Sequence, residues 1–157
     1  MTPGKIGSIP AAVVTNTGDV SIPGDGSHNI LSFDTNQVNI DGVHSTTTNS
    51  SRLTAPIDGL YEVHGQAKWG IGVSGGFREL EIYLGAFAAR EGVSEIPDTA
   101  GIGVVQDVSA FVHLHAGDYV ILAARQTSGS AISITGTTSE GAPDTPEFDM
   151  HWVEPSS

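Results

Sequence analysis

The sequence predicts an all-β fold, a sandwich of two antiparallel sheets with no significant helix. Val, Ile and Thr total 41 of the 157 residues, whereas Leu, Met and Lys total 11, so residues that favour strands dominate. Twenty glycines and eight prolines, many in clusters such as residues 22–27 and 96–101, interrupt the chain at the spacing of short strands joined by turns. An antiparallel sandwich is therefore the expected architecture.

The order of the elements follows from the same punctuation. Residues 1–10 combine prolines and glycines with few apolar anchors and are expected to form a flexible arm. Residues 11–157 then form a single domain, since a chain of this length folds around one core. Strands are expected at about 11–15, 28–34, 52–55, 59–69, 77–90, 102–115, 118–126, 131–136 and 147–153.

Alternation within these segments indicates which side chains face the core. In residues 59–69, Tyr61, Val63, Ala67 and Trp69 are apolar while the residues between them are polar, the period-two pattern of a half-buried antiparallel strand. The same argument points Leu80, Ile82, Leu84 and Ala86 inward with Glu79 and Glu81 outward, and Val108, Ala110, Val112 and Leu114 inward with Asp107, Ser109, His113 and His115 outward.

Some apolar residues are left on the outward faces. Phe111 shares a face with His113, Tyr83 shares one with Glu81, and residues 118–126 are apolar on both faces. Apolar side chains on both faces of an antiparallel strand imply a second covering layer. The sequence is compatible with two sources of this covering layer: other parts of the same chain, or a neighbouring subunit.

Charge and composition exclude several classes of function. The net charge is -12, and the six Lys and Arg are scattered, so nucleic acids and anionic membranes are poor partners. The absence of cysteine excludes disulfides, thiolate zinc sites and cysteine nucleophiles. No segment has the length and hydropathy of a membrane span, so we expect no membrane insertion. No segment has the pattern of a secretory signal, so we expect the protein to assemble in a cytoplasm.

No catalytic motif stands in a convincing context, so we expect no enzyme and no catalytic residue. Residues 72–76 (GVSGG) match G-x-S-x-G, but a nucleophile elbow needs a strand-turn-helix. No helical pattern follows these residues, which are expected to form a loop between two strands. No order of Ser, His and acid suggests a triad.

Two kinds of metal site are considered. His113 and His115 leave the same face of one strand and offer two ligands to a transition metal, one fewer than a site needs. Calcium needs six to eight oxygens; acids in the loops supply some of them, although in no known motif spacing. We expect no cofactor, with calcium as the alternative; the loop acids concerned are Asp25, Glu95, Asp98, Glu140 and Asp144.

Five segments carry a resemblance to a known family. They are LSFDT (31–35), RLTAPIDGLYEV (52–63), FRELEIYL (77–84), AGDYVILAARQTSG (116–129) and FDMHWV (148–153). In this order they resemble the globular-head domain of the first complement component, in the tumour necrosis factor-like jelly-roll superfamily. The similarity is greatest to the stand-alone versions of bacteria and tailed phages, and it covers about residues 11–153.

The resemblance implies a jelly roll and a homotrimer in which one sheet packs against the neighbouring subunits. In the family this sheet includes the strands that correspond to 59–69, 118–126 and 147–153. The resemblance therefore implies subunit contacts near His64, Tyr119, Leu122 and Trp152, to which the outward Phe111 is added. This chain departs from the family in lacking a collagen stalk and in carrying acids on its final strand, Glu147, Asp149 and Glu154.

From these observations we expect a non-enzymatic, homotrimeric structural or attachment protein of a phage virion. A capsid decoration (cement) protein and a tail or fibre tip protein both fit, with a capsid protein, a tail protein or a host surface receptor as partner. The arm would dock the trimer to the particle, and three identical sets of loops would add weak contacts through multivalency. The alternative is a soluble lectin-like or protein-binding recognition module at a cell surface.

Overall fold

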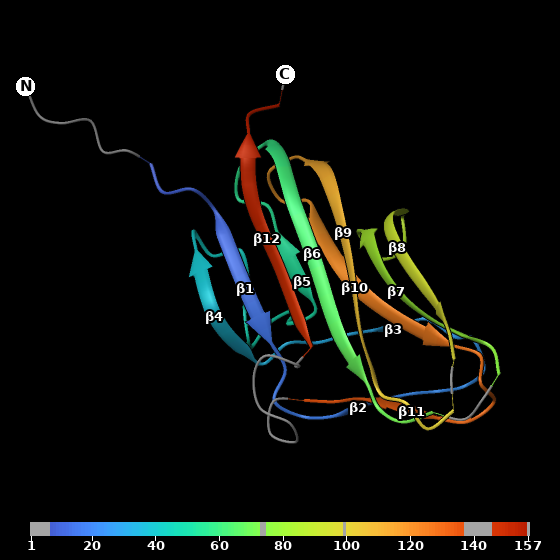
Figure 1. The fold of residues 1–157 in the computed structure, drawn as a ribbon. Coiled ribbons are helices and arrows are strands. Elements are labelled where there is room, and N and C mark those ends of the chain that lie inside the picture. The colour runs from blue at the N-terminus through green and yellow to red at the C-terminus, as the bar shows by residue number, and fades with distance from the viewer. Residues whose placement is uncertain (1–6, 73–74, 99, 137–145, 157) are drawn as a thin grey trace, which may run out of the picture.

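The computed structural model describes residues 7–72, 75–98, 100–136 and 146–156, which form twelve strands and no helix (Figure 1). The strands are β1 (Ala11–Thr15), β2 (Val20–Ile22), β3 (Asn29–Ile30), β4 (Thr35–Ile40), β5 (Arg52–Thr54), β6 (Gly59–Trp69), β7 (Phe77–Leu84), β8 (Ala89–Pro97), β9 (Val104–Leu114), β10 (Tyr119–Gln126), β11 (Ile132–Ile134) and β12 (Glu147–Glu154).

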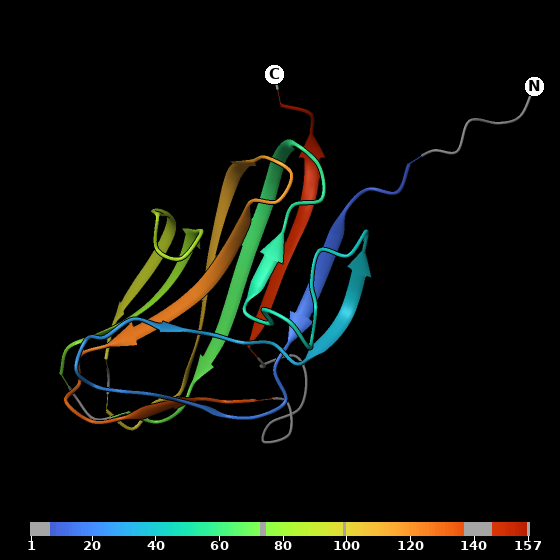
Figure 2. The same cartoon turned by 180° about the vertical axis from the view of Figure 1, so that it is seen from behind.

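The strands form two antiparallel sheets. The seven-stranded sheet has the order β2-β11-β6-β12-β1-β4, with β9 also paired to β6, and the five-stranded sheet has the order β3-β10-β7-β8, with β5 also paired to β10. Figure 1 shows β4, β1, β12, β6 and β9 side by side, and the view from behind in Figure 2 brings β5 and β10 forward. The predicted two-sheet sandwich is confirmed.

Strand β6 is the centre of the seven-stranded sheet. It pairs with β9 from Gly59↔Leu114 to Trp69↔Val104, and with β12 on its other side. Its residues alternate between buried and half-buried along the whole strand, as the sequence predicts. The odd-numbered side chains therefore face the five-stranded sheet, and the even-numbered ones form part of an outer face.

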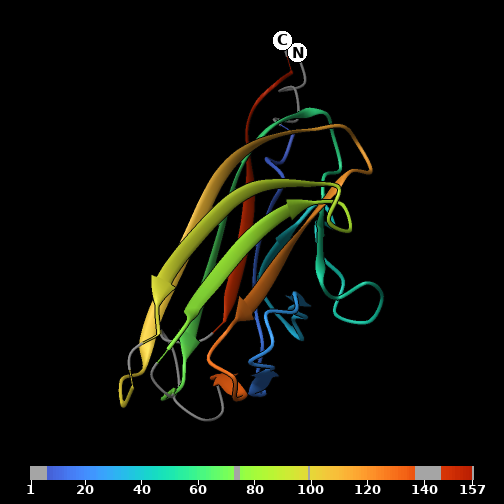
Figure 3. The same ribbon diagram turned by 90° about the vertical axis from the view of Figure 1, so that its right-hand side faces the viewer.

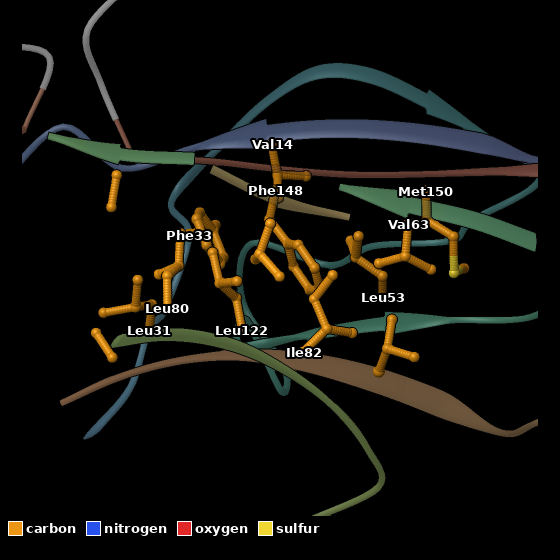
Figure 4. Packing of buried hydrophobic residues seen from close by; sticks show 14 of the residues in the cluster. Val14, Leu31, Phe33, Leu53, Val63, Leu80, Ile82, Leu122, Phe148 and Met150 are labelled. Carbon is orange, nitrogen blue, oxygen red and sulfur yellow. The ribbon is translucent and has the colours of Figure 1, made fainter. Parts of the chain in front are cut away.

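The core lies between the two sheets. Phe148 of β12 stacks on Phe33 with ring centroids 5.7 Å apart, and both rings are almost completely buried. Figure 4 shows Phe148 in the same layer as Ile82 and Leu122, which come from the opposite sheet. On one side of the sandwich β8 and β9 contact each other, where a side chain on Gly92 would meet the Ser109 carbonyl (Figure 3).

The segment RLTAPIDGLY forms the local structure that its residues predict. The fully buried Tyr61 donates a hydrogen bond from its hydroxyl to the Ile57 carbonyl, at 2.8 Å, across the turn that precedes β6. At the start of the strand only glycine fits at residue 59, because a Cβ there would lie 2.2 Å from Nε1 of Trp152. These residues position strands, as expected for scaffold.

Some boundaries differ from the sequence prediction. The expected strand 77–90 ends at Leu84, because the chain turns at Gly85 and Phe87, with φ of 61° and 65°, and returns as β8. Ala86 is consequently exposed in the turn and does not face the core as predicted. Strands β2 and β4 were not predicted, since β2 has three residues and β4 is almost wholly exposed.

The expectation for residues 118–126 is wrong in one respect. Strand β10 belongs to the five-stranded sheet, so it does not share a sheet with β6 and β12. Its outward Ile121 is flanked in register by Arg52 and Tyr83, and its outward Ala123 by Ile30 and Glu81. Both apolar side chains are buried within this chain, so their apolarity needs no neighbouring subunit.

A buried ion pair closes one end of the sandwich. The Arg78 side chain is 1% exposed; its Nε donates to Asp98 Oδ1 at 2.9 Å and its Nη2 to the same oxygen at 2.5 Å. The guanidinium also lies 5.8 Å from the ring centroid of Trp69. Asp98, a loop acid considered as a calcium ligand, thus forms an ion pair with Arg78.

The expected N-terminal arm falls mostly outside the described residues. Of residues 7–10, Ser8 donates hydrogen bonds to the carboxyl of Asp41, and Pro10 is buried, with its carbonyl accepting from the Trp152 amide. Ser8 and Pro10 are therefore attached to the domain. Residues 1–6 of the predicted flexible arm lie outside the described residues.

Candidate binding faces of the two sheets

The outer face of the seven-stranded sheet is defined here by the outward side chains of β1, β4, β6, β9 and β12. Cross-strand pairing orders them in rows, such as Ile40–Ala11–His151–Glu62–Phe111 and Val38–Val13–Asp149–His64–Ser109. The residues at the β4 and β9 ends of the first row are apolar, while its centre is titratable. The face is therefore mixed in character.

Apolar side chains are strongly exposed on this outer face. Phe111 is 63% exposed, and Val105 on the same strand is 44% exposed. At the opposite edge, Val38 and Ile40 of β4 are each 40% exposed. Large apolar side chains in two groups on a sheet face that none of the described residues covers are typical of a protein contact surface.

A titratable stripe runs between these apolar groups. His64 Nδ1 lies 2.9 Å from Asp149 Oδ2, and His151 Nε2 lies 3.2 Å from Glu62 Oε2. Glu147 is on the same face of β12 as Asp149, two residues earlier. Among the described residues, His64, Glu147 and Asp149 bring one ligand atom each to within 4.8 Å of one another.

The surroundings disfavour negative charge on two carboxyls of this stripe, those of Asp149 and Glu147. Burial raises the pKa of Asp149, although His64 opposes the shift. Burial also raises the pKa of Glu147, and the charge of Asp149 adds to that effect. Two carboxyls whose ionised forms are disfavoured, beside one imidazole, make a site that gains from an additional positive charge.

The outer face of the five-stranded sheet carries a second ordered cluster. The fully buried Glu81 carboxyl accepts hydrogen bonds from the Tyr83 hydroxyl at 3.0 Å and from Arg90 at 3.1 Å, and its other oxygen lies 2.7 Å from Nδ1 of His28. The two rings of His28 and Tyr83 meet edge to face at 5.9 Å. Glu81 thus fixes the orientation of three side chains around it.

Phe87 completes this cluster from the turn between β7 and β8. Its ring centroid lies 4.9 Å from Tyr83 and 5.5 Å from His28, and its side chain remains 40% exposed. A φ of 65° is unusual for a residue with a bulky side chain. The turn therefore holds an aromatic ring at the surface in a backbone conformation that costs free energy.

The five predicted contact residues lie in three different places. His64 and Phe111 share the outer face of the seven-stranded sheet. Tyr119 lies on the other sheet, beneath the guanidinium of Arg52 at 4.1 Å. Leu122 is fully buried in the core of the single chain, and Trp152 is half-buried over Gly59, with Nε1 3.3 Å from the Asp58 carbonyl.

The five predicted contact residues therefore differ in whether they can contact a neighbouring subunit. Leu122 has no exposed surface to offer a neighbouring subunit, because the strand that carries it points its even-numbered side chains into the sandwich. Trp152 faces the core side of β12 like Phe148 and Met150. Contact roles for His64, Phe111 and Tyr119 stay predictions.

Among the residues that the structure describes, none joins the predicted metal ligands His113 and His115 as a third ligand. His113 is exposed on β9, and His115 lies beyond the strand end with Nδ1 3.7 Å from Asp58 Oδ2. The group that the described residues do form contains His64, predicted only as a contact residue, and two acids that the sequence marked only as a departure from the family. Its signal in the sequence is the pair of acids at alternate positions of one strand, Glu147 and Asp149.

The loop acids considered for calcium are dispersed. Asp25 accepts hydrogen bonds from the amide and hydroxyl of Ser27, and Glu95 pairs in register with Glu79 on the neighbouring strand. Glu140 and Asp144 lie outside the described residues, as do Val73 and Ser74 of the G-x-S-x-G match. The described residues of that match, Gly72, Gly75 and Gly76, lie between the strands β6 and β7, as predicted.

The comparison with solved structures gives a neighbour that matches the whole sandwich. The globular domain of the zebrafish complement 1qA protein superposes with a TM-score of 0.64, covering 94% of this chain and 99% of that chain, at 13% sequence identity. The fold is a jelly roll of the complement globular-domain type. The predicted fold class is confirmed, and the family resemblance is confirmed at the level of fold; its bacterial or phage type stays a prediction.

Other comparisons add no activity. No protein-family model and no curated protein matches the sequence. In the described part of the chain, no pocket is found and no helix is long and apolar enough to cross a membrane.

Proposed function

We propose that this chain is a non-enzymatic recognition and attachment module that assembles as a homotrimer through the outer face of the seven-stranded sheet. The observation that carries the proposal is the exposure of Phe111, at 63%, on a sheet face that also exposes Val105, Val38 and Ile40. A large aromatic ring at the surface is a typical anchor of a protein interface.

A second copy of the chain is the occupant that this face suits. The apolar residues form two separated groups, one on β9 and one on β4 and β1, so a contact between the first group of one copy and the second group of another is heterologous. Heterologous contacts generate a ring when the rotation closes. The fold that the chain shares with the complement globular domain supports three copies, which is the assembly implied by the family resemblance.

The magnitude is adequate for an anchor residue. A Phe side chain buries about 150–200 Å² when fully covered, so covering the exposed 63% of Phe111 removes on the order of 100 Å² from water. At about 25 cal/mol per Å², this contributes roughly 2.5 kcal/mol for each chain. Loss of this contribution at three sites weakens a trimer strongly.

Sedimentation velocity tests the proposal. The unmodified chain is expected to sediment as a species with three times the chain mass of 16.2 kDa. The variant Phe111→Ser is expected to shift the population to monomer. Phe87→Ser is the matched control, since Phe87 is also exposed, at 40%, but lies on the other sheet. A monomer for the unmodified chain, or equal dissociation in both variants, refutes the proposed assembly face.

The cluster around Glu81 is our candidate for the recognition surface. Assembly through the seven-stranded sheet leaves the five-stranded sheet outward, with Phe87, Tyr83, His28 and Arg90 held in fixed positions. Exposed aromatic rings next to hydrogen-bonding groups suit glycans and protein loops. This observation favours the alternative of a lectin-like or protein-binding module as much as attachment to a particle.

The virion role is the finer part of the proposal. It rests on the resemblance of five segments to stand-alone domains of bacteria and tailed phages, with a capsid or tail protein or a host receptor as partner and assembly in the host cytoplasm. Co-purification with virions tests it, using the full chain and a chain lacking residues 1–10. Particle binding that survives the deletion contradicts docking through the arm, and absence of the protein from purified particles contradicts the virion role.

A further inference from the structure

We propose that His64, Glu147 and Asp149 form a binding site for one divalent transition-metal ion, zinc in particular, on the outer face of the seven-stranded sheet. One ligand atom from each residue lies within 4.8 Å of the other two. A tetrahedral zinc ion with bonds of about 2.1 Å holds its ligands about 3.4 Å apart. Small side-chain rotations therefore suffice to close the three ligands around an ion.

The backbone already places the three side chains together. Asp149 of β12 is the direct cross-strand partner of His64 on β6, and Glu147 lies two residues before Asp149 on the same face. Because β12 is paired on one side with β6 and on the other with β1, neither strand can shift its register without breaking a ladder. The donor set is thus fixed by the sheet and not by a loop.

The side chains are also partly withdrawn from water. All three residues are half-buried, and the side chains of His64 and Asp149 are 33% and 22% exposed. The charges of His64, His151 and Glu62 act on the Asp149 carboxyl, and Asp149 and Glu147 repel one another when both are ionised. A divalent ion would supply the positive charge that two half-buried carboxyls need when both are ionised.

The chemistry of the donors selects the class of metal. One imidazole nitrogen and two carboxylate oxygens suit zinc and its first-row neighbours, whereas calcium takes six to eight oxygens. Three protein ligands leave one coordination position of a tetrahedral ion open. Water or a donor from another molecule can complete that position.

Titration calorimetry of the full chain with zinc chloride, after treatment with EDTA and dialysis, tests this site. We expect one zinc ion per chain, and weaker binding of magnesium and calcium. His64→Ala and Asp149→Asn are each expected to lower the affinity for zinc by at least about tenfold, because each removes a ligand atom. The matched controls His113→Ala and Asp107→Asn, exposed on the same face, should leave the affinity unchanged.

Three results would overturn the assignment: no zinc binding by the unmodified chain, unchanged affinity in both site variants, or tighter binding of calcium than of zinc. Circular dichroism of each variant in EDTA establishes that it folds, and Glu147→Gln replaces any variant that does not. The site does not depend on the proposed assembly. Sedimentation in EDTA and in zinc therefore distinguishes failure of the metal site from failure of the trimer.

Discussion

The contact between Gly65 and Leu122 joins the two sheets and gives the sharpest test of the core. A Cβ on Gly65 would lie 2.3 Å from Cδ1 of Leu122, far inside van der Waals contact. Gly65→Ala should therefore overpack the core and cost about 1–3 kcal/mol of unfolding free energy. Leu122→Ala removes a fully buried side chain and should cost about 2–5 kcal/mol.

Together the two substitutions are expected to compensate. In the double variant the methyl group at residue 65 enters the volume that the Leu122 side chain vacates. The double variant should therefore be more stable than the sum of the single effects predicts, by about 1–3 kcal/mol. Urea unfolding at one fixed protein concentration measures all four corners of the cycle.

A control pair makes this test specific. Leu114 is also fully buried but pairs with Gly59, six residues from Gly65 along β6, so Gly65→Ala with Leu114→Ala should be additive within about 0.5 kcal/mol. Additivity in the Gly65–Leu122 pair would refute the packing described here.

Three further outcomes are expected. Asp98→Ala should destabilise the chain by about 3–5 kcal/mol in urea unfolding, because it leaves the buried guanidinium of Arg78 uncompensated, and a smaller loss on adding Arg78→Met would identify the unpaired charge as the cause. Burial of Asp34 opposes its ionisation, but hydrogen bonds from Thr17 and Thr35 prevail and lower its pKa below 3.8; its stabilising effect should be complete above about pH 5 and lost as the pH falls through the lowered value. As the pH is lowered from 6 to 2, the free energy of unfolding should accordingly decrease less steeply for Asp34→Asn than for the unmodified chain. Parallel curves for the two proteins would exclude the effect. Three chains at -12 each carry -36, so the trimer should dissociate more readily at 10 mM than at 150 mM salt, where the Debye length falls from about 30 to 8 Å; light scattering that is independent of salt would place the acids away from the contacts.

The parts of the fold that the sequence predicts best are those with strong periodicity. Residues 59–69 alternate without interruption, and β6 has the predicted bounds and the predicted inward face. Strand β8 is not predicted, because the alternation of apolar and polar residues in 77–90 continues by chance through the turn at Gly85. At that residue a positive φ reverses the chain direction. Strand β4 has little periodicity to detect, since most of its side chains are exposed.

The candidate sites depend on register, which a single sequence does not contain. His64 and Asp149 are 85 residues apart, and only the pairing of β6 with β12 brings them to 2.9 Å. His113 and His115 attract attention because they are neighbours in sequence, yet they find no third ligand among the described residues. The family resemblance places Leu122 and Tyr119 at one contact surface. The two residues are three positions apart on one strand, and because successive side chains alternate between the faces of a sheet, they point to opposite faces.

The place of β12 has a consequence for how the molecule forms. This strand inserts between β1 and β6, pairing residue 13 with residue 149, so the central sheet stays divided until nearly the whole described chain is available. Contacts of such sequence separation make folding slow. In the interval β1 and β6 each present an unpaired edge, to which a strand from another chain can add. Rapid synthesis at high concentration should therefore favour aggregation, and a peptide of residues 146–156 added to a chain shortened at residue 136 should restore the sheet by filling that gap.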